Sequence, residues 1–414
     1  MGRLTRLFAD HQIAEVENLL KEDESAPDGP GKLNPQQKQL FRGVLLNREN
    51  QPQQSIQLLE PLVNALPPDA GPVGQNAEQK LLRKSLAEDY LRAGDWAKAA
   101  AAYQTYAAKL ALTPDEQAEI ELPLKLLPLV VDHPPMTVEP GDAFALASDR
   151  DPLGLNDIPV FVDAQSHDWM LDPTAPFNLI CRSSAKLVGL KVSEQSASVS
   201  TITGRPIQVH ATVIPRFTIG TVTYRNMTAF VFEDADYYFP KSKYQVRGVL
   251  GYPAVSALGS LTVSADSRIE VQPGPKGERV TAGARFYLDG DRILAALGKE
   301  GDERMYVIDA GGQQTYLTSR YYAEHSDDFN GKKMELLPPP GEPDAPPLPT
   351  YIAESATLLV GATPASFQYV PVLTQPIAGA AIDDTYGTLG MDALDELKSY
   401  TFDYRTMRFA VRTE

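Results

Sequence analysis

Two aspartates carry most of the chemistry that this sequence could support. The first to stand out is Asp309, which ends an apolar run and is followed by Ala310, Gly311 and Gly312. A carboxylate at the end of a buried strand needs hydrogen-bond donors, and glycine lets backbone amides approach it closely. A chain can present a catalytic carboxylate in this way. An isolated Asp-x-Gly, however, is more commonly a turn in which the Asp side chain caps the following amides.

An internal repeat gives this motif a wider context. The segment GVLGYPAVSALGSLTV begins at Gly248, and the segment GTLGMDALDELKSYTF begins at Gly387. Both read Gly-x-Leu-Gly, continue into a short amphipathic stretch and then into residues typical of strands. We therefore expect two copies of one β-rich unit.

If the two units are copies, Asp309 should have a counterpart in the first one. Asp309 lies 81 residues before Gly390, and Asp172 lies 79 residues before Gly251. Asp172 also ends an apolar run. Further matching landmarks are a small residue three positions after each Asp (Ala175, Gly312), an expected helix start (Ser183, Ser319) and an expected hairpin turn (Gly220, Gly361).

Taken as a set, these landmarks resemble a tandem pair of retropepsin-like aspartic protease domains. In that family a strand ends in Asp-Thr-Gly, and a hairpin, paired strands, an apolar-apolar-Gly turn and a short helix follow. Two such domains in one chain are similar to the bilobal arrangement of pepsin. The resemblance implies two β-rich lobes, residues 157–275 and 284–414, with a proline-rich insertion at 336–351 in the second.

The resemblance also implies a chemistry. Asp172 and Asp309 would be two carboxyl groups about 3 Å apart that share one proton, one acting as a base on water and the other as an acid. Peptide or protein would be the substrate, and no cofactor or metal is implied. The residues implied to support the pair or to bind substrate are Thr174, Ala175, Ala310, Gly311 and Gly312.

Both motifs depart from the family pattern, so three functions stay open. Pro173 has no amide hydrogen, and Thr174 stands where the family has glycine, one position too late to replace the family's threonine. Ala310 lacks the hydroxyl expected at its position. The chain could be an aspartic endopeptidase, a degenerate pseudoprotease that holds peptide without cutting it, or a structural component without a ligand in the groove.

The first 125 residues are predicted to be helical because apolar residues recur there every three or four positions. Two segments share a small residue, a second small residue twelve positions later and a large residue four positions after that: Gly43, Ser55 and Leu59, and then Ala87, Ala99 and Tyr103. This spacing resembles tetratricopeptide helical hairpins, with the loop Pro67–Asn76 taking up extra length; a plain helical bundle is the alternative. Residues 126–156 are expected to be a linker, so the fold class is α+β.

Composition narrows the partners. The 414 residues carry a formal charge of -16, which argues against nucleic acid and anionic membranes. A single cysteine and five scattered histidines provide no disulfide or recognisable metal motif. No apolar run is long enough to span a membrane, and the first residues do not resemble a signal peptide. We expect a peptide or protein ligand, a protein partner for the helical part, and a bacterial, periplasmic or secreted location.

Overall fold

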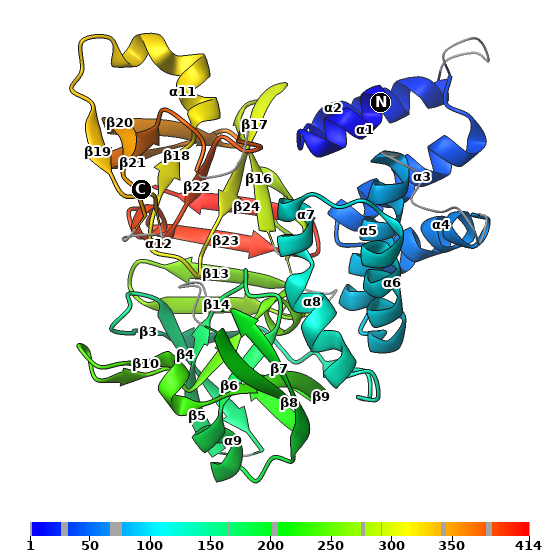
Figure 1. Ribbon diagram of the computed structural model, residues 1–414. Coiled ribbons are helices and arrows are strands. Elements are labelled where there is room, and N and C mark those ends of the chain that lie inside the picture. Colours follow the sequence, from blue (N-terminus) through cyan, green and yellow to red (C-terminus); the bar gives the residue numbers. More distant parts are fainter. Residues whose placement is uncertain are drawn as a thin grey trace. The chain divides into compact units, whose positions relative to one another are not determined.

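The computed structural model describes most of the chain and divides it by its contacts into two units. The described residues are 2–25, 32–66, 77–163, 165–200, 206–274, 278–290, 292–340, 345–377 and 383–413. Unit 1 comprises Met1–Pro135, Gln195–Val199 and Leu288–Gly290, and unit 2 comprises Met136–Glu194, Ser200–Tyr287 and Asp291–Glu414. Helices make up most of unit 1, whereas strands dominate unit 2 (Figure 1).

Unit 1 contains the helices that the sequence predicts. They are α1 (Arg3–Ala9), α2 (Ile13–Ser25), α3 (Pro35–Arg48), α4 (Pro52–Asn64), α5 (Ala77–Arg92), α6 (Trp96–Lys109), α7 (Pro114–Glu119), α8 (Glu121–Leu126) and the 3-10 turn η1 (Leu127–Leu129). Several starts are encoded locally. For example, Asn34 and Thr113 each form a capping box, and a proline occupies the next position.

The spacing of small residues in this unit has a direct packing role. Helix α3 packs against α4, and α5 packs against α6. A β-carbon on Gly43 would lie 2.3 Å from Leu59 Cδ2, so glycine allows α3 and α4 to approach. Ser55 Oγ donates a hydrogen bond to the Gly43 carbonyl at 2.8 Å, which fixes the same crossing. The predicted loop Pro67–Asn76 lies outside the described residues.

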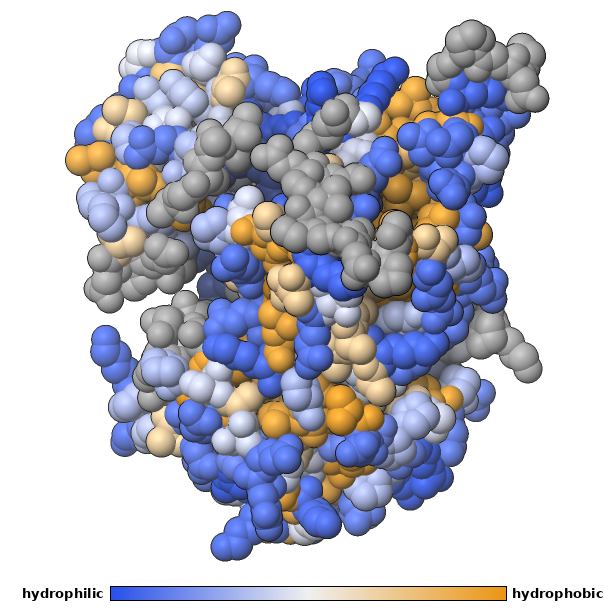
Figure 2. Space-filling model, turned by 45° about the vertical axis from the view of Figure 1, so that its right-hand side comes forward, coloured by the Kyte–Doolittle hydropathy of each residue, from blue (hydrophilic) through white to orange (hydrophobic). Residues whose placement is uncertain are grey.

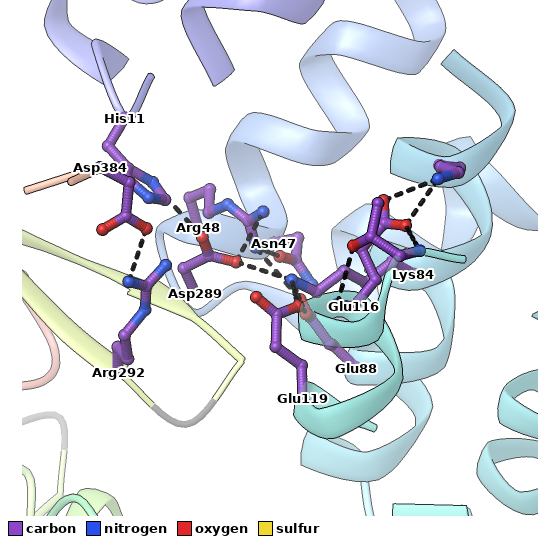
Figure 3. A network of polar contacts seen from close by, with 12 residues as sticks. His11, Asn47, Arg48, Lys84, Glu88, Glu116, Glu119, Asp289, Arg292 and Asp384 are labelled. Atoms are coloured by element: carbon purple, nitrogen blue, oxygen red, sulfur yellow. Dashed lines mark hydrogen bonds and ion pairs between the residues drawn. The ribbon is translucent and has the colours of Figure 1, made fainter. Parts of the chain in front are cut away.

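A buried ion cluster also holds unit 1 together (Figure 3). The Asp289 carboxylate forms ion pairs with Arg48 at 2.9 Å and with Lys84 at 3.4 Å. The Nδ1 atom of His11 lies 3.3 Å from the same carboxylate. Arg48 further binds Glu88 at 3.1 Å. Burial disfavours the charged form of Lys84, but the carboxylates of Asp289 and Glu88 outweigh this and raise its pKa. The cluster fastens Leu288–Gly290, at the end of β15 (Ala284–Asp289), to helices that precede it by about two hundred residues.

The two halves of unit 2 lie within residues 137–272 and 284–412, of which Gln195–Val199 and Leu288–Gly290 belong to unit 1. The first of these ranges contains fourteen described strands. They are β1 (Thr137–Glu139), β2 (Phe144–Ala147), β3 (Asp149–Arg150), β4 (Asn156–Val162), β5 (Gln165–Leu171), β6 (Asn178–Cys181), β7 (Val192–Ser200), β8 (Pro206–Ile219), β9 (Val222–Phe232), β10 (Tyr238–Phe239), β11 (Tyr244–Gln245), β12 (Gly248–Leu250), β13 (Ser260–Ser264) and β14 (Arg268–Gln272). The short helices are α9 (Arg182–Leu187), η2 (Asp234–Tyr237) and α10 (Tyr252–Ser256).

The second half, residues 284–412, has a similar element order. Its strands are β15, β16 (Arg292–Lys299), β17 (Asp302–Ile308), β18 (Tyr316–Leu317), β19 (Glu335–Leu337), β20 (Leu348–Val360), β21 (Thr363–Leu373), β22 (Gly387–Leu389), β23 (Ser399–Asp403) and β24 (Arg408–Arg412). Its helices are α11 (Ser319–His325), η3 (Ser326–Phe329) and α12 (Met391–Leu394). The hairpins predicted around Gly220 and Gly361 are confirmed as β8–β9 and β20–β21.

Strand pairing is the same around each of the two aspartates. Strand β12 lies between β5, to which it is parallel, and β6, to which it is antiparallel. In the second half β22 lies between β17 and β18 with the same directions. The next strand outward, β9 or β21, runs parallel to β6 or β18. Each aspartate therefore follows a strand that is held on the interior of a sheet rather than at an edge.

The two halves meet strand to strand. Strand β13 pairs antiparallel with β23, and Thr262 lies opposite Thr401 with their hydroxyls 2.8 Å apart. Strands β14 and β24 flank this central pair within a thirteen-stranded sheet of the described residues (Figure 1). Because backbone hydrogen bonds run across the junction, this pairing fixes the positions of both halves.

The proline-rich segment 336–351 is partly incorporated into that sheet. Its ends form β19 and the start of β20, which pair antiparallel with Leu336 opposite Pro349. In the same register Thr350 lies opposite Glu335 and Leu348 lies opposite Leu337. The segment therefore connects two paired strands, and residues 341–344 lie outside the described part of the chain.

Hydrophilic side chains cover most of the face shown in Figure 2, and hydrophobic residues form patches between them. This matches the 43% hydrophobic content and the acidic charge of the chain. Within the described residues, no helix is long and apolar enough to cross a membrane.

Replacing Asp289 by alanine should destabilise the protein strongly. The change leaves buried Arg48 without one of its carboxylates, and breaking a buried ion pair costs about 3–5 kcal/mol. The matched control is Asp384→Ala, which breaks the exposed Arg292–Asp384 pair and should cost about 0–1 kcal/mol. Urea unfolding followed by helical circular dichroism measures both. Equal losses for the two variants would contradict a stabilising role for the buried cluster.

Candidate active site

Each aspartate is positioned by the parallel strand next to the one that it follows. The amide of Asp172 donates to the Leu250 carbonyl at 3.0 Å, and the amide of Asp309 donates to the Leu389 carbonyl at 2.9 Å. These acceptors end β12 and β22, immediately before the second glycine of each Gly-x-Leu-Gly segment. The repeat noticed in the sequence is therefore part of the support for the two aspartates.

The second glycine of each segment lies against the loop that follows the aspartate. A β-carbon on Gly251 would be 2.4 Å from the Phe177 carbonyl oxygen, and one on Gly390 would be 2.8 Å from the Gln314 backbone. Glycine is required here because backbone packs directly on backbone. The same approach allows the amides of Tyr252 and Met391 to donate, each at 2.8 Å, to the residue three positions after the aspartate.

Two polar side chains that the sequence analysis did not single out fasten these glycines. Asn178 Oδ1 accepts from the Gly251 amide at 3.1 Å, and Thr315 Oγ1 accepts from the Gly390 amide at 2.8 Å. Both acceptors are buried and stand six residues after an aspartate. A search for polar residues at equal distances from Asp172 and Asp309 would have found them.

The structure brings Asp172 and Asp309 together through one hydroxyl. Thr174 Oγ1 lies 2.6 Å from Asp172 Oδ1 and 3.4 Å from Asp309 Oδ1. The Asp172 Oδ1 atom also accepts from the amides of Thr174 at 2.9 Å and Ala175 at 3.0 Å. Asp309 Oδ1 accepts from the Gly311 amide at 3.2 Å. The carboxylates therefore come from equivalent loops and meet at a shared polar contact.

Gly311 completes this contact from the second loop. A β-carbon on Gly311 would lie 2.2 Å from Asp172 Oδ1, so the backbone of the second loop packs against the carboxylate of the first. Thr174 holds the equivalent position, two residues after Asp172, and its side chain reaches the carboxylate of the other loop. Gly312 lies against its own aspartate, because a β-carbon there would be 2.1 Å from Asp309 Oδ2.

Burial and proximity make both carboxyl groups hard to ionise. Burial raises the pKa of Asp172, although the hydrogen bonds from Thr174 and Ala175 oppose this. Burial also raises the pKa of Asp309, and the negative charge of Asp172 raises it further. Both residues nevertheless remain partly exposed, so that water can reach the pair. The site therefore holds two partly exposed carboxyl groups whose pKa values are both raised.

Comparison with known proteins agrees with this geometry for the first half. Residues 158–254 match the family model described as aspartyl protease. This part of the chain is similar to aspartyl proteases. The matched segment includes Asp172 and ends before Asp309, so the relation of the second loop to the first rests on the strand pairing described above. A search of curated proteins gives no match.

The solved structures that match this chain include two seed globulins and a retropepsin-like protease. Basic 7S globulin from soybean is 11% identical, with a TM-score of 0.40, and the match covers 66% of this chain and 97% of the globulin chain. Conglutin gamma from lupine is 11% identical, with a TM-score of 0.39, and covers 66% and 95%. A retropepsin-like aspartic protease from Rickettsia conorii is 17% identical, with a TM-score of 0.24, and covers 33% and 95%.

The departures from the protease motif have different consequences in the aspartic-protease-like region. Pro173 has no amide hydrogen, but Asp172 does not lose a hydrogen bond by this, because the amides that donate to its carboxylate belong to Thr174 and Ala175. Thr174 contacts both carboxylates although it stands one position late in the motif. Ala310 is buried and brings no hydroxyl to the pair. Cys181 is buried beside Ser184, as expected of a core residue. No group of three or more possible metal ligands occurs among the described side chains.

Gly311→Ala should disturb the pair. The new β-carbon has to move away from Asp172 Oδ1, and overpacking of this kind costs about 1–3 kcal/mol. Gly2→Ala is the control, because its β-carbon would meet no atom closer than 3.7 Å. Thermal unfolding of both variants tests the contact, and an unchanged melting temperature for Gly311→Ala would contradict it.

Asp309→Asn should stabilise the protein at neutral pH. Because the pKa of Asp309 is raised in the folded state, the folded protein holds a proton that the unfolded chain has released, and stability falls as pH rises through that window. The substitution removes this loss, which amounts to about 1.4 kcal/mol for each tenfold change in the acid dissociation constant. The gain should shrink below about pH 4, near the pKa of an unfolded Asp. Exposed Asp302→Asn on β17 is the control, and a gain independent of pH would refute the explanation.

Proposed function

We propose that this protein is an aspartic peptidase that hydrolyses peptides with the Asp172–Asp309 pair. The observation that carries the proposal is the single Thr174 hydroxyl in contact with both carboxylates, which come from two equivalently built loops. Two raised carboxyl pKa values at a partly exposed position are costly for a protein that does not use them. The aspartyl protease match over residues 158–254 supports the same chemistry.

In the proposed reaction one carboxylate takes a proton from a water molecule as the water oxygen attacks the peptide carbonyl carbon. The protonated carboxyl group donates to the carbonyl oxygen at the same time. When the C–N bond breaks, the carboxyl group that took the water proton gives it to the leaving amine, and one hydroxyl of the tetrahedral intermediate returns its proton to the other carboxylate. Water is therefore added across the peptide bond, and the pair ends with one proton, as it began.

The proposed architecture has two lobes, residues 157–275 and 284–414, that resemble a pepsin-like pair. The matching strand directions around β12 and β22 and the central pairing of β13 with β23 support this proposal. An extended peptide between the lobes would bind by backbone hydrogen bonds. The proline-rich hairpin of β19 and β20 belongs to the second of these lobes.

The helical region, residues 1–125, is proposed to be a tetratricopeptide-like module that binds a protein partner. The close approach of Gly43 to Leu59 and the burial of Ala87 and Ala99 support hairpin packing of that type. A helical module in the same chain as a peptidase could recruit a substrate or a regulator. Residues 126–156 connect the module to the first lobe, and three short strands within them, β1, β2 and β3, pair with strands of unit 2.

A second candidate is a pseudoprotease that binds peptide without cutting it. One observation favours it: the Thr174 side chain stands between the two carboxylates, whereas the equivalent position of the second loop is Gly311, which has no side chain. A side chain at this point can exclude the attacking water. In this alternative the groove between the proposed lobes would still hold extended peptide.

Digestion of a diverse library of unstructured peptides, from about pH 3 to pH 7, separates the two candidates. We expect cleavage by the natural protein and a loss of at least about a hundredfold for Asp172→Asn and Asp309→Asn, a typical contribution of a general acid or base. Asp302→Asn, which alters an exposed side chain, should cleave normally.

Cleavage retained in both active-site variants would point to a contaminant and refute the proposal. If a folded natural protein cleaves nothing at any pH, the peptidase function is wrong. Binding of the same library to the inactive protein would then support the pseudoprotease alternative.

A further inference from the structure

The two loops differ at one position that faces the opposite carboxylate. Two residues after Asp172 the chain has Thr174, and two residues after Asp309 it has Gly311. The glycine backbone packs on Asp172, whereas the threonine hydroxyl reaches Asp309 Oδ1. Otherwise the loops are built alike, so this difference makes the site asymmetric and places an exchangeable proton between the carboxyl groups.

We infer that Thr174 is a positioning residue that relays the proton between Asp309 and Asp172 and keeps it on Asp309 in the resting protein. This inference deepens the proposed peptidase function and concerns the same site. It assigns to a threonine hydroxyl the role that direct contact between two carboxyl groups would otherwise have.

The distances give the direction of the relay. A hydroxyl has one hydrogen to donate but can also accept. At 2.6 Å the contact of Thr174 Oγ1 with Asp172 Oδ1 has the length of a bond to an ionised carboxylate. The Thr174 hydrogen therefore points to Asp172. At 3.4 Å from Asp309, the same oxygen is left to accept a hydrogen from a protonated Asp309.

The surrounding donors agree with this assignment. Asp172 Oδ1 receives three hydrogen bonds, from the Thr174 hydroxyl and from the amides of Thr174 and Ala175. Such a set stabilises an anion. Asp309 has longer contacts and also feels the charge of Asp172, so the proton of the pair belongs on Asp309.

The transfer is balanced. Asp309 gives its proton to Thr174 Oγ1 while Thr174 gives its own hydrogen to Asp172 Oδ1. Asp309 becomes the carboxylate, Asp172 becomes the acid, and threonine is neutral before and after. No other reactant is needed, and the reverse of this step returns the proton to Asp309, its resting position.

Carbon-13 NMR of aspartate carboxyl groups tests the relay without any substrate. The signals of Asp172 and Asp309 are identified by their loss in Asp172→Asn and Asp309→Asn. In Thr174→Val, which removes the hydroxyl but keeps the branched shape, the titration midpoint of Asp172 should rise by about one pH unit or more, because a donor to the ionised carboxylate is lost. Thr174→Ser should titrate like the natural protein.

If Thr174→Val titrates like the natural protein, or if Thr174→Ser titrates like Thr174→Val, the relay is wrong. Should the valine variant fail to fold, Thr174→Ala removes the hydroxyl without bulk, and the same two criteria apply to it. The NMR titration contains no peptide, so its outcome does not depend on whether the protein cleaves peptides. Where cleavage occurs, its pH profile should shift in Thr174→Val and be restored in Thr174→Ser.

Discussion

Two carboxyl groups of like charge meet in unit 2 of this protein, and the surrounding loops are arranged to tolerate them. Asp172 and Asp309 share a contact with Thr174, and Gly311 leaves space for the backbone to pack on Asp172. Burial raises the pKa of both carboxyl groups, and the charge of Asp172 raises the pKa of Asp309 further. Amide donors on each loop then stabilise the remaining charge.

Such a contact requires a rigid support, which the strands provide. Each aspartate follows a strand that is hydrogen-bonded to a parallel neighbour, β12 or β22, whose final carbonyl accepts from the amide of that aspartate. The antiparallel pairing of β13 with β23, with Thr262 opposite Thr401, fixes the two halves to each other. Backbone hydrogen bonds therefore determine the distance between the carboxylates, and side chains adjust the chemistry.

Unit 1 is stabilised by a different kind of interaction. There the Asp289 carboxylate lies beside Arg48, Lys84 and His11, and the charges of Arg48 and Lys84 compensate its own. The contrast with the aspartate pair is informative. A buried carboxylate paired with cations is a structural feature, whereas two carboxylates that share a contact at a partly exposed position are the basis of the proposed peptidase function.

The sequence alone determined the elements and their order. Periodicity predicted the helices of unit 1, and the matching distances from Asp172 to Gly251 and from Asp309 to Gly390 paired the two loops, because backbone geometry repeats when sequence pattern repeats. Only the tertiary structure decided which side chains contact each other. Pro173 proved harmless, Thr174 contacted both carboxylates, and Asp289 joined helices distant in sequence. These outcomes depend on contacts between segments that local sequence does not encode, since a shift of about 1 Å makes or breaks a hydrogen bond.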